Sequence, residues 1–154
     1  MEIRRFEEKD RPAVSKLMRA LIDYHHRLDP EDHKTAEEFT ELEDYFEEIA
    51  KHKDSAFFVA EENGEVTGYL AARVEDGPSY SIHKKIGVVA DVAVDEKYRR
   101  QGVAEKLFGA ALEWFQKKQL ATIELSVYSK NLPAIALWKK LGFQEYKIRM
   151  RKNI

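Results

Sequence analysis

The chain has 154 residues, enough for one domain, and 44% of them are hydrophobic, which is enough to form a core. Its formal net charge of −2 lacks the strong positive field of nucleic-acid-binding proteins, so nucleic acid is not an expected partner. The absence of cysteine excludes disulfide bonds, thiolate metal sites and a cysteine nucleophile.

The first third of the chain is predicted to form one short strand and two amphipathic helices. The strand covers Glu2 to Phe6, and Asp10 followed by Pro12 is typical of a helix start. Thr35 and Glu38 have the spacing of a capping box and predict the start of the second helix. The inward faces of the two helices are predicted to be Val14, Leu17, Met18, Leu21, Ile22 and His25, and Phe39, Leu42, Phe46 and Ile49.

Strand signals dominate the middle of the chain. Residues 56–61 and 65–74 are predicted to pair as a hairpin around Asn63-Gly64, because Asn-Gly is the strongest short hairpin signal. The run Val88 to Val94 is short, β-branched and bounded by turn residues, and it predicts a buried strand.

The last third is predicted to form a crossover. A helix with inward residues from Ala104 to Phe115 leads to a strand, Thr122 to Tyr128. Another helix then begins at Asn131 and ends at Gly142, and Gln144 to Arg151 closes as a final strand. Strand, helix and strand at this spacing predict a right-handed parallel crossover, and therefore an α/β protein.

The turn between the Val94 strand and the next helix has the features of an anion cradle. Its residues are Arg99, Arg100, Gln101, Gly102, Val103 and Ala104. A helix start offers free N–H groups and partial positive charge, and a glycine lets a ligand approach the backbone closely. Taken alone, the hexapeptide fits an ordinary surface turn equally well. Its position after a buried strand favours the anion site, because ligands of open α/β sheets gather there.

Two segments resemble conserved blocks of the GNAT superfamily of acyl-CoA-dependent N-acyltransferases. They are VAVDEKYRRQGVAEKLF, with Arg99, Gly102 and Ala104 at the positions of the family pattern, and NLPAIALWKKLGF. The resemblance implies a single N-acetyltransferase domain over residues 1–154. It implies a three-layer fold: a central, mostly antiparallel mixed sheet with one parallel, splayed strand pair and helices on both faces.

The resemblance also implies where acetyl-CoA, the expected acyl donor, would bind. Its pyrophosphate would rest on residues 99–104, and its pantetheine arm would pair with the backbone of Val92, Ala93 and Val94. Asn131 matches the family's asparagine beside the cofactor, although it also fits an ordinary helix cap. Trp138 is assigned to the cofactor site as well, at a position where many family members have a tyrosine acid.

Asp91 is the candidate general base, because an alkylammonium must lose a proton before it attacks a thioester. It is the only charged residue in an apolar strand, and alternation places it on one face with Val89 and Ala93. It would receive the amine proton through water or orient the acceptor. The alternative is a structural carboxylate that accepts hydrogen bonds from a neighbouring loop.

Tyr128 is the candidate acid for the leaving thiolate, because the indole of Trp138 does not titrate. Its alternative role is that of an aromatic residue on a sheet face, with solvent protonating the thiolate.

The acceptor site is predicted around the end of the first helix, at Tyr24, His25 and Asp29. Between Asp29 and Glu48 the chain holds ten acidic residues and one base, Lys34. An acidic wall would attract a small cationic amine, whereas the alternative is a solvated helix face. No metal is expected, because the adjacent His25 and His26 point apart on a helix.

The sequence therefore predicts an acetyltransferase that acts on a small cationic primary amine, by direct attack in a ternary complex. One alternative is a non-catalytic acyl-CoA-binding regulatory module. Another is an acetyltransferase of protein N-termini or lysines. The resemblance further implies a homodimer by analogy. Residues 1–5 lack the apolar core of a signal peptide and no apolar run reaches transmembrane length, so we expect a cytoplasmic protein without a membrane partner.

Overall fold

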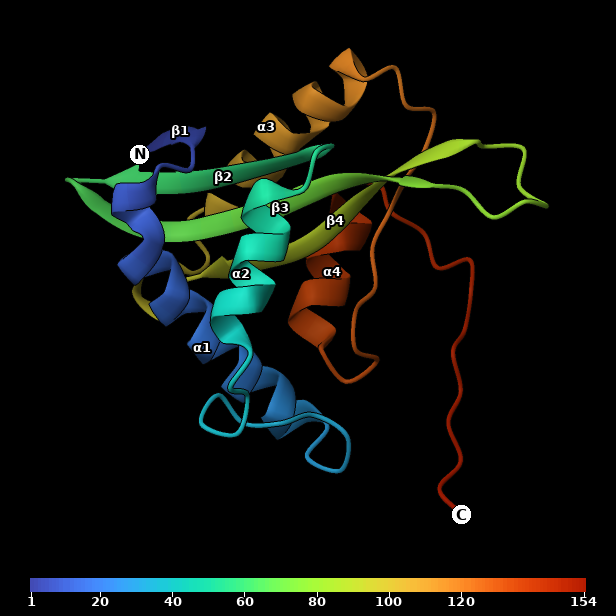
Figure 1. The fold of residues 1–154 in the computed structure, drawn as a ribbon, viewed down its shortest axis with the longest axis horizontal. Coiled ribbons are helices and arrows are strands. Elements are labelled where there is room, and N and C mark those ends of the chain that lie inside the picture. Colours follow the sequence, from blue (N-terminus) through green and yellow to red (C-terminus); the bar gives the residue numbers. More distant parts are fainter.

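A computed structural model describes residues 1–154 as one mixed sheet covered by helices (Figure 1). None of the helices combines the length and the apolarity that crossing a bilayer requires. The strands are β1 (Glu2–Arg5), β2 (Ser55–Glu62), β3 (Glu65–Asp76), β4 (Lys85–Val94) and β5 (Ile123–Glu124), and the helices are α1 (Arg11–Leu28), α2 (Leu42–Lys51), α3 (Val103–Lys117) and α4 (Leu132–Lys140).

The sheet follows the order β1-β2-β3-β4-β5, and only the last pair is parallel. That parallel pairing stops after Gly87 with Ile123 and Val88 with Glu124, while β4 continues to Val94. The carboxyl-terminal half of β4 therefore has β3 on one side and no strand on the other. This arrangement confirms the predicted mixed sheet with one parallel pair that separates at its carboxyl end.

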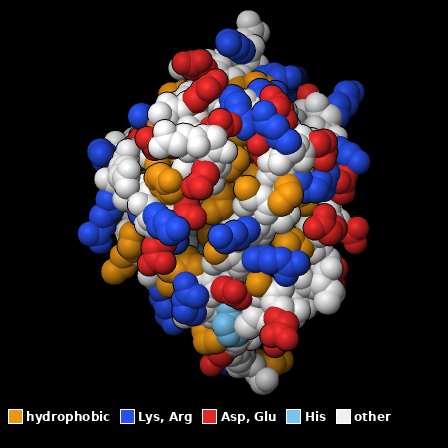
Figure 2. All heavy atoms as spheres, turned by 90° about the vertical axis from the view of Figure 1, so that its left-hand side faces the viewer, with side chains coloured by type: hydrophobic (Ala, Val, Ile, Leu, Met, Phe, Trp, Pro, Cys, Tyr) orange, Lys and Arg blue, Asp and Glu red, His pale blue; other side chains and the backbone are white.

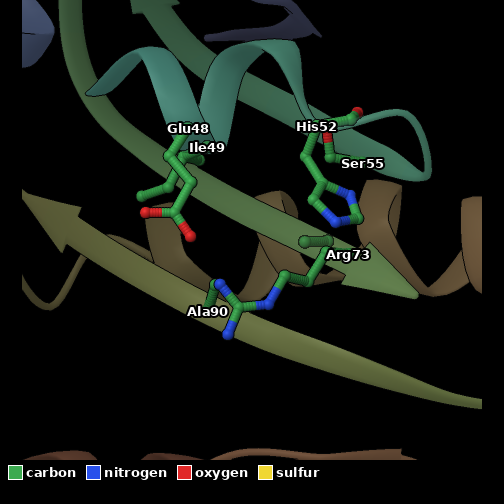
Figure 3. A pocket seen from close by; sticks show the side chains of 7 residues that line it. Glu48, Ile49, His52, Ser55, Arg73 and Ala90 are labelled. Carbon is green, nitrogen blue, oxygen red and sulfur yellow. The ribbon is translucent and has the colours of Figure 1, made fainter. Parts of the chain in front are cut away.

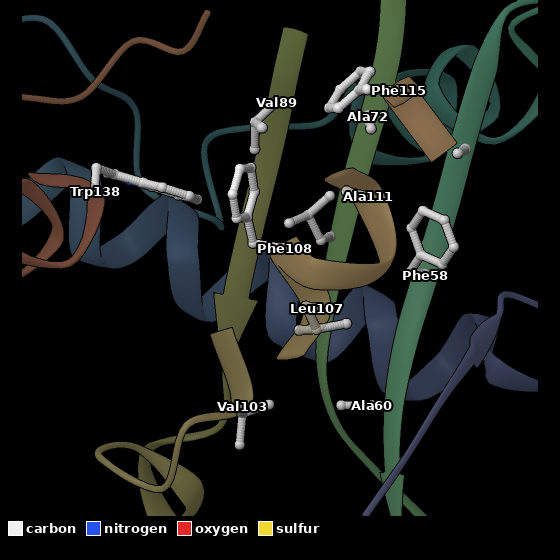
Figure 4. Close-up of a cluster of buried hydrophobic side chains, with 12 residues drawn as sticks. Phe58, Ala60, Ala72, Val89, Val103, Leu107, Phe108, Ala111, Phe115 and Trp138 are labelled. Carbon is white, nitrogen blue, oxygen red and sulfur yellow. The ribbon is translucent and has the colours of Figure 1, made fainter. Parts of the chain in front are cut away.

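Helices cover both faces of the sheet, each over its own hydrophobic cluster. On one face α3 and α4 contribute Leu107, Phe108, Phe115 and Trp138 (Figure 4). On the other face α1 and α2 contribute a second cluster, whose buried helix residues are Val14, Leu17, Met18, Leu42, Phe46 and Ile49. Figure 1 shows α1 and α2 in front of the sheet and α3 behind it, which confirms the three layers.

The hairpin prediction is confirmed down to its turn residues. Asn63 and Gly64 have φ angles of 53° and 81° and join β2 to β3. Positive φ at both central positions is the requirement of a type I′ turn, which explains the Asn-Gly sequence.

A β-bulge in β4 corrects the predicted facing of one residue. Asp91 pairs with Ala71 and Val89 with Ala72, so Ala90 is the extra residue between them. Because the bulge adds one residue, Val89 packs on the α3 side whereas Asp91 and Ala93 lie on the α1 and α2 side. The prediction that Asp91 shares a face with Ala93 is right, and the prediction that it shares a face with Val89 is wrong.

The predicted start of the second helix differs in the structure, whereas the start of the first helix is confirmed in position but lacks the predicted side-chain cap. Thr35 and Glu38 form both hydrogen bonds of a capping box, at 2.9 and 3.2 Å, but they enclose a turn, and α2 begins at Leu42. Asp10 precedes α1 without capping it, because its carboxylate accepts hydrogen bonds from the Arg4 guanidinium at 2.7 and 2.8 Å.

The strands predicted near the C-terminus are shorter or absent. β5 has two residues instead of the predicted span from 122 to 128, and residues 144–151 form no strand. Their alternating apolar residues Tyr146, Ile148 and Met150 are 71, 84 and 89% exposed, because no neighbouring strand covers them. Figure 1 shows this segment, in red, running away from the sheet.

The packing of α3 on the sheet sets the position of the turn between β4 and α3. A substitution of Leu107 tests that packing. Its side chain is fully buried. We expect Leu107→Ala to lower the free energy of unfolding by about 2–5 kcal/mol, because it leaves a cavity in the core. Urea denaturation measures this, with the exposed Lys106→Ala as a control. A loss equal to that of the control would contradict the described packing.

Candidate active site

The turn from β4 to α3 is held by its own hydrogen bonds. The Asp95 carboxylate accepts from the Lys97 N–H at 3.0 Å, and the Gln101 amide donates to the Lys97 carbonyl at 3.0 Å. The Arg99 guanidinium donates to the carbonyl of Val94 at 3.3 Å. These contacts fix the path of the chain between the last residue of the strand and the first turn of the helix.

The N-terminus of α3 has no side-chain cap. Gly102 stands at the cap position with φ 77°, and the first intrahelical bond runs from the Lys106 N–H to the Gly102 carbonyl at 3.1 Å. A Cβ at Gly102 would meet no atom within 4 Å, so the space in front of this helix start is open. The first N–H groups of α3 and the positive end of its dipole therefore suit an anion such as a diphosphate.

Some residues of the predicted cradle can offer an anion their side chains, and others can offer only backbone N–H groups. Arg99 and Arg100 are exposed, and Arg100 has a φ of 61°. Val103 is 2% exposed because its side chain packs in the core, so this residue can offer a ligand only its backbone N–H. These residues provide backbone donors and guanidinium groups side by side, which are the donors that phosphate groups accept from.

The end of β4 offers an edge for an extended ligand. Val92, Ala93 and Val94 pair with Leu70, Tyr69 and Gly68 of β3, and no strand pairs with their other side. A free strand edge carries N–H and C=O groups that an extended chain with amides matches, and of the groups at this edge the Val94 carbonyl already accepts from Arg99. This is the arrangement that the pantetheine assignment requires.

Asp91 lies one residue before this edge and makes a short hydrogen bond to a buried phenol. The Tyr69 hydroxyl donates to Asp91 Oδ2 at 2.7 Å. Burial raises the pKa of Asp91 to about 6, while the hydrogen bonds from Tyr69 and from the Val92 N–H act in the opposite direction. A carboxylate with this pKa is ionised at neutral pH and basic enough to accept a proton.

The predicted acceptor residues and the predicted acid come together around the N-terminus of α4. Tyr24 donates its hydroxyl to Asn131 Oδ1 at 3.1 Å, and the same oxygen caps α4 by accepting from the Ala134 N–H at 3.3 Å. His25 packs on Tyr128 with ring centroids 5.0 Å apart. Four predicted site residues from two ends of the chain therefore form one wall.

A histidine that the sequence did not single out completes this wall. The His33 ring lies 5.4 Å from His25 and 6.0 Å from Tyr128, measured between centroids. Burial, with a smaller contribution from His33, lowers the pKa of His25 to about 4, so His25 is neutral at pH 7. His33 stands in a polar loop without periodicity, and the sequence carries no signal that would have found it.

Asp29 is engaged by the C-terminal segment. The Arg151 guanidinium donates to both Asp29 oxygens, at 2.9 and 3.0 Å, and lies 3.1 Å from Asp32. These contacts lower the pKa of Asp29, with the Arg151 hydrogen bond as the largest cause. The carboxylate predicted to attract an acceptor is thus paired with a cation of the chain itself.

The model of the acetyltransferase (GNAT) family matches residues 14–143, which include β4, the turn, α3 and α4. The chain belongs to this acetyltransferase family. The N-alpha-acetyltransferase of Sulfurisphaera tokodaii is 42% identical over 110 residues, which cover 68% of this chain and 65% of that protein. The N-alpha-acetyltransferase of Saccharolobus solfataricus is 39% identical over 110 residues, with the same coverage of 68% and 65%. The chain thus spans about two thirds of the length of these relatives.

Solved structures share the fold of this GNAT chain. A mutant of the BH1408 protein from Bacillus halodurans has a TM-score of 0.90 at 23% identity, over 100% of this chain and 99% of that one. The aminoglycoside N-acetyltransferase AAC(6')-Iy, solved in complex with CoA, has a TM-score of 0.74 at 19% identity, over 99% of this chain and 100% of that one. At these identities the likeness shows the fold alone, and it agrees with the predicted GNAT architecture.

Trp138 of the GNAT chain lies in the core. It is 6% exposed and packs edge-on against Phe108 at 5.7 Å and Phe143 at 5.4 Å between centroids. Its assignment to the cofactor site stays a prediction. Its position between α4 and α3 gives it a packing role in either case.

Two cavities lie outside the cradle. One of about 700 Å³ is bordered by α1, the β2–β3 turn and Lys97. Figure 2 shows the side of the molecule with this turn, where acidic and basic side chains are interspersed around hydrophobic ones. The other cavity, of about 10 Å³, lies between Glu48 and His52 on one side and Arg73 and the bulge residue Ala90 on the other (Figure 3). The second has the size of a single water molecule.

Proposed function

We propose that this GNAT chain transfers the acetyl group of acetyl-CoA to a primary amine. The observation that carries the proposal is the open, uncapped start of α3 at Gly102, reached from Asp91 along one strand and turn. One unit of the fold thereby offers a diphosphate site, a free strand edge and a base.

The residues of the chain have distinct parts in this reaction. Acetyl-CoA supplies the acetyl group as a thioester. The start of α3 would bind its diphosphate, and the free edge of β4 would orient the arm that carries the thioester. Asp91 would take the proton of the acceptor ammonium, directly or through water. The amine nitrogen then forms a bond to the acetyl carbon, the carbon–sulfur bond breaks, and the nitrogen loses a second proton to solvent as the amide forms. The thiolate takes up a proton from solvent, or from Tyr128, which solvent then reprotonates.

The acceptor that we propose is a small cationic amine. Asp29 and Asp32 lie near Tyr128, and ten acidic residues fall between Asp29 and Glu48. Arg151 pairs with Asp29 and Asp32 and offsets part of this charge, and the other acidic residues leave the segment negative. This charge would raise the local concentration of a cation.

The α-amine of a protein N-terminus is the second candidate acceptor. It is favoured by the relatives from Sulfurisphaera tokodaii and Saccharolobus solfataricus, which are named N-alpha-acetyltransferases. A peptide N-terminus is itself a primary amine, so the same base and cradle serve either acceptor.

Calorimetry with acetyl-CoA tests the proposal first. We expect micromolar binding, much tighter than that of adenosine diphosphate, because the free edge of β4 contributes contacts that the diphosphate cannot make. Thiol release with spermidine and with a peptide that has a free N-terminus then separates the two acceptors, and an N-blocked peptide is the control. A folded protein that does not bind acetyl-CoA would refute the proposal, and binding without thiol release would indicate a non-catalytic module.

A further inference from the structure

The partner of Asp91 is a phenol that the sequence did not single out. Tyr69 belongs to β3, opposite Ala93, and its side chain is fully buried. Its hydroxyl donates to Asp91 Oδ2 at 2.7 Å. A buried hydroxyl aimed at a carboxylate in the middle of an apolar cluster is a costly arrangement unless the bond is made, so the two groups depend on each other.

The other groups around this pair provide no cation for Asp91. From α2, Tyr45 lies near enough for Asp91 to raise its pKa, after burial as the larger cause. Arg73 of β3 lowers the pKa of Tyr45, and Glu48 of α2 raises it. From α1 come the apolar residues Val14, Leu17 and Met18. The ionised form of Asp91 is therefore favoured by two neutral donors, the Tyr69 hydroxyl and the Val92 N–H.

We propose that Tyr69 is a positioning residue for acetyl transfer, which fixes Asp91 Oδ2 and keeps the carboxyl group ionised at neutral pH. The role rests on the proposed function, since Asp91 is the proposed base. Tyr69 touches no reacting atom. Its hydroxyl holds one carboxylate oxygen in place, so the carboxylate keeps one orientation toward the acceptor.

The direction in which Tyr69 shifts the pKa of Asp91 follows from the direction of the hydrogen bond between them. A donor to a carboxylate stabilises the charged form and lowers its pKa, against the burial that raises it. Without the Tyr69 hydroxyl, this hydrogen bond no longer counteracts the effect of burial. The pKa of Asp91 then rises above its value of about 6. The fraction of base available at neutral pH falls accordingly.

Tyr69→Phe is the variant that tests the role. Phenylalanine keeps the ring that packs edge-on against Phe57 at 5.5 Å, so the core is retained. In the pH dependence of kcat/KM for the acceptor, we expect the acid limb to move up by about one pH unit or more. At high pH, where Asp91 is ionised in both proteins, the difference in kcat narrows but does not vanish, because the carboxylate of the variant has lost its fixed orientation. Acetyl-CoA affinity is unchanged throughout.

Tyr45→Phe is the matched control, because Tyr45 lies on the same face but has no hydrogen bond to Asp91. We expect its acid limb to coincide with that of the wild type. Equal shifts in both variants would overturn the proposal, since a general change in burial would then explain them. An unchanged acid limb in Tyr69→Phe would overturn it directly.

NMR can follow the titration of the Asp91 carboxyl carbon without any substrate. It therefore measures the effect of Tyr69 on the pKa of Asp91 independently of acetyl transfer. We expect the titration midpoint of Asp91 to rise in Tyr69→Phe by the same amount as the acid limb. If the titration midpoint rises but the acid limb of the pH–rate profile does not move, the hydrogen bond from Tyr69 to Asp91 is purely structural, and the positioning role is overturned. Absence of acetyl transfer by the wild type would refute the proposed function itself, and it would be seen before any variant is made.

Discussion

Gly102→Glu is expected to weaken acetyl-CoA binding by roughly 100-fold or more while the domain stays folded. The new carboxylate would stand in the open space before α3, satisfy the free N–H groups and repel a diphosphate. The positive φ of 77° adds a backbone cost of about 1–2 kcal/mol, which the fold can tolerate. Calorimetry with acetyl-CoA measures the loss.

Gly64→Glu is the control for backbone strain in this experiment. Gly64 has a φ of 81°, and a Cβ there also meets no atom within 4 Å, but it lies in the β2–β3 turn. We expect this variant to bind acetyl-CoA as the wild type does. Equal affinities of the Gly102 variant and the wild type would show that the cradle is only a turn.

Asp91→Asn is expected to lower turnover by about 10²- to 10⁴-fold, the range of a lost general base. Acetyl-CoA affinity should persist, because Asp91 faces α1 and α2 whereas Val92 and Val94 pack on the α3 side. The wild-type rate should fall as the pH drops through about 6, where the Asp91 carboxyl takes up its proton and can no longer accept one.

The pH–rate profile of Asp91→Asn decides between the catalytic and the structural role. Asparagine keeps the size of the side chain but does not titrate in this range, so the acid limb near pH 6 should disappear. If the limb persists at the same pH, another group is the base and Asp91 has no part in proton transfer. Circular dichroism of both proteins would check that the fold is retained.

Much of the fold follows from local signals in the sequence. The Asn63-Gly64 turn, the apolar run of β4 and the glycine before α3 each require a specific backbone conformation from few residues. The hexapeptide 99–104 was predicted as a strand-to-helix turn, and the structure has this turn with Gly102 in the left-handed conformation. Such signals are short-range, so they are visible without knowledge of the partner elements.

Features that depend on pairing between distant segments could not be predicted. The bulge at Ala90 becomes apparent only when β4 is set against β3, and it reversed the expected facing of Val89. The bond between Tyr69 and Asp91 joins residues 22 positions apart, and the ion pair between Asp29 and Arg151 joins residues 122 apart. Alternation over residues 144–151 predicted a strand, but a strand also needs a neighbour, and the sequence alone does not say whether one is in reach.

The hydrogen bond from Tyr24 to Asn131 has a consequence for the order in which the proposed acceptor wall is assembled. It spans 107 positions, and Asn131 Oδ1 at the same time begins the last helix. A ribosome-bound chain that already contains α1, the whole β2–β4 meander and α3 would therefore still lack Asn131 and the wall that we propose for the acceptor. Under the proposed function, acceptor recognition would be complete only after α4 has been synthesised and docked against α1.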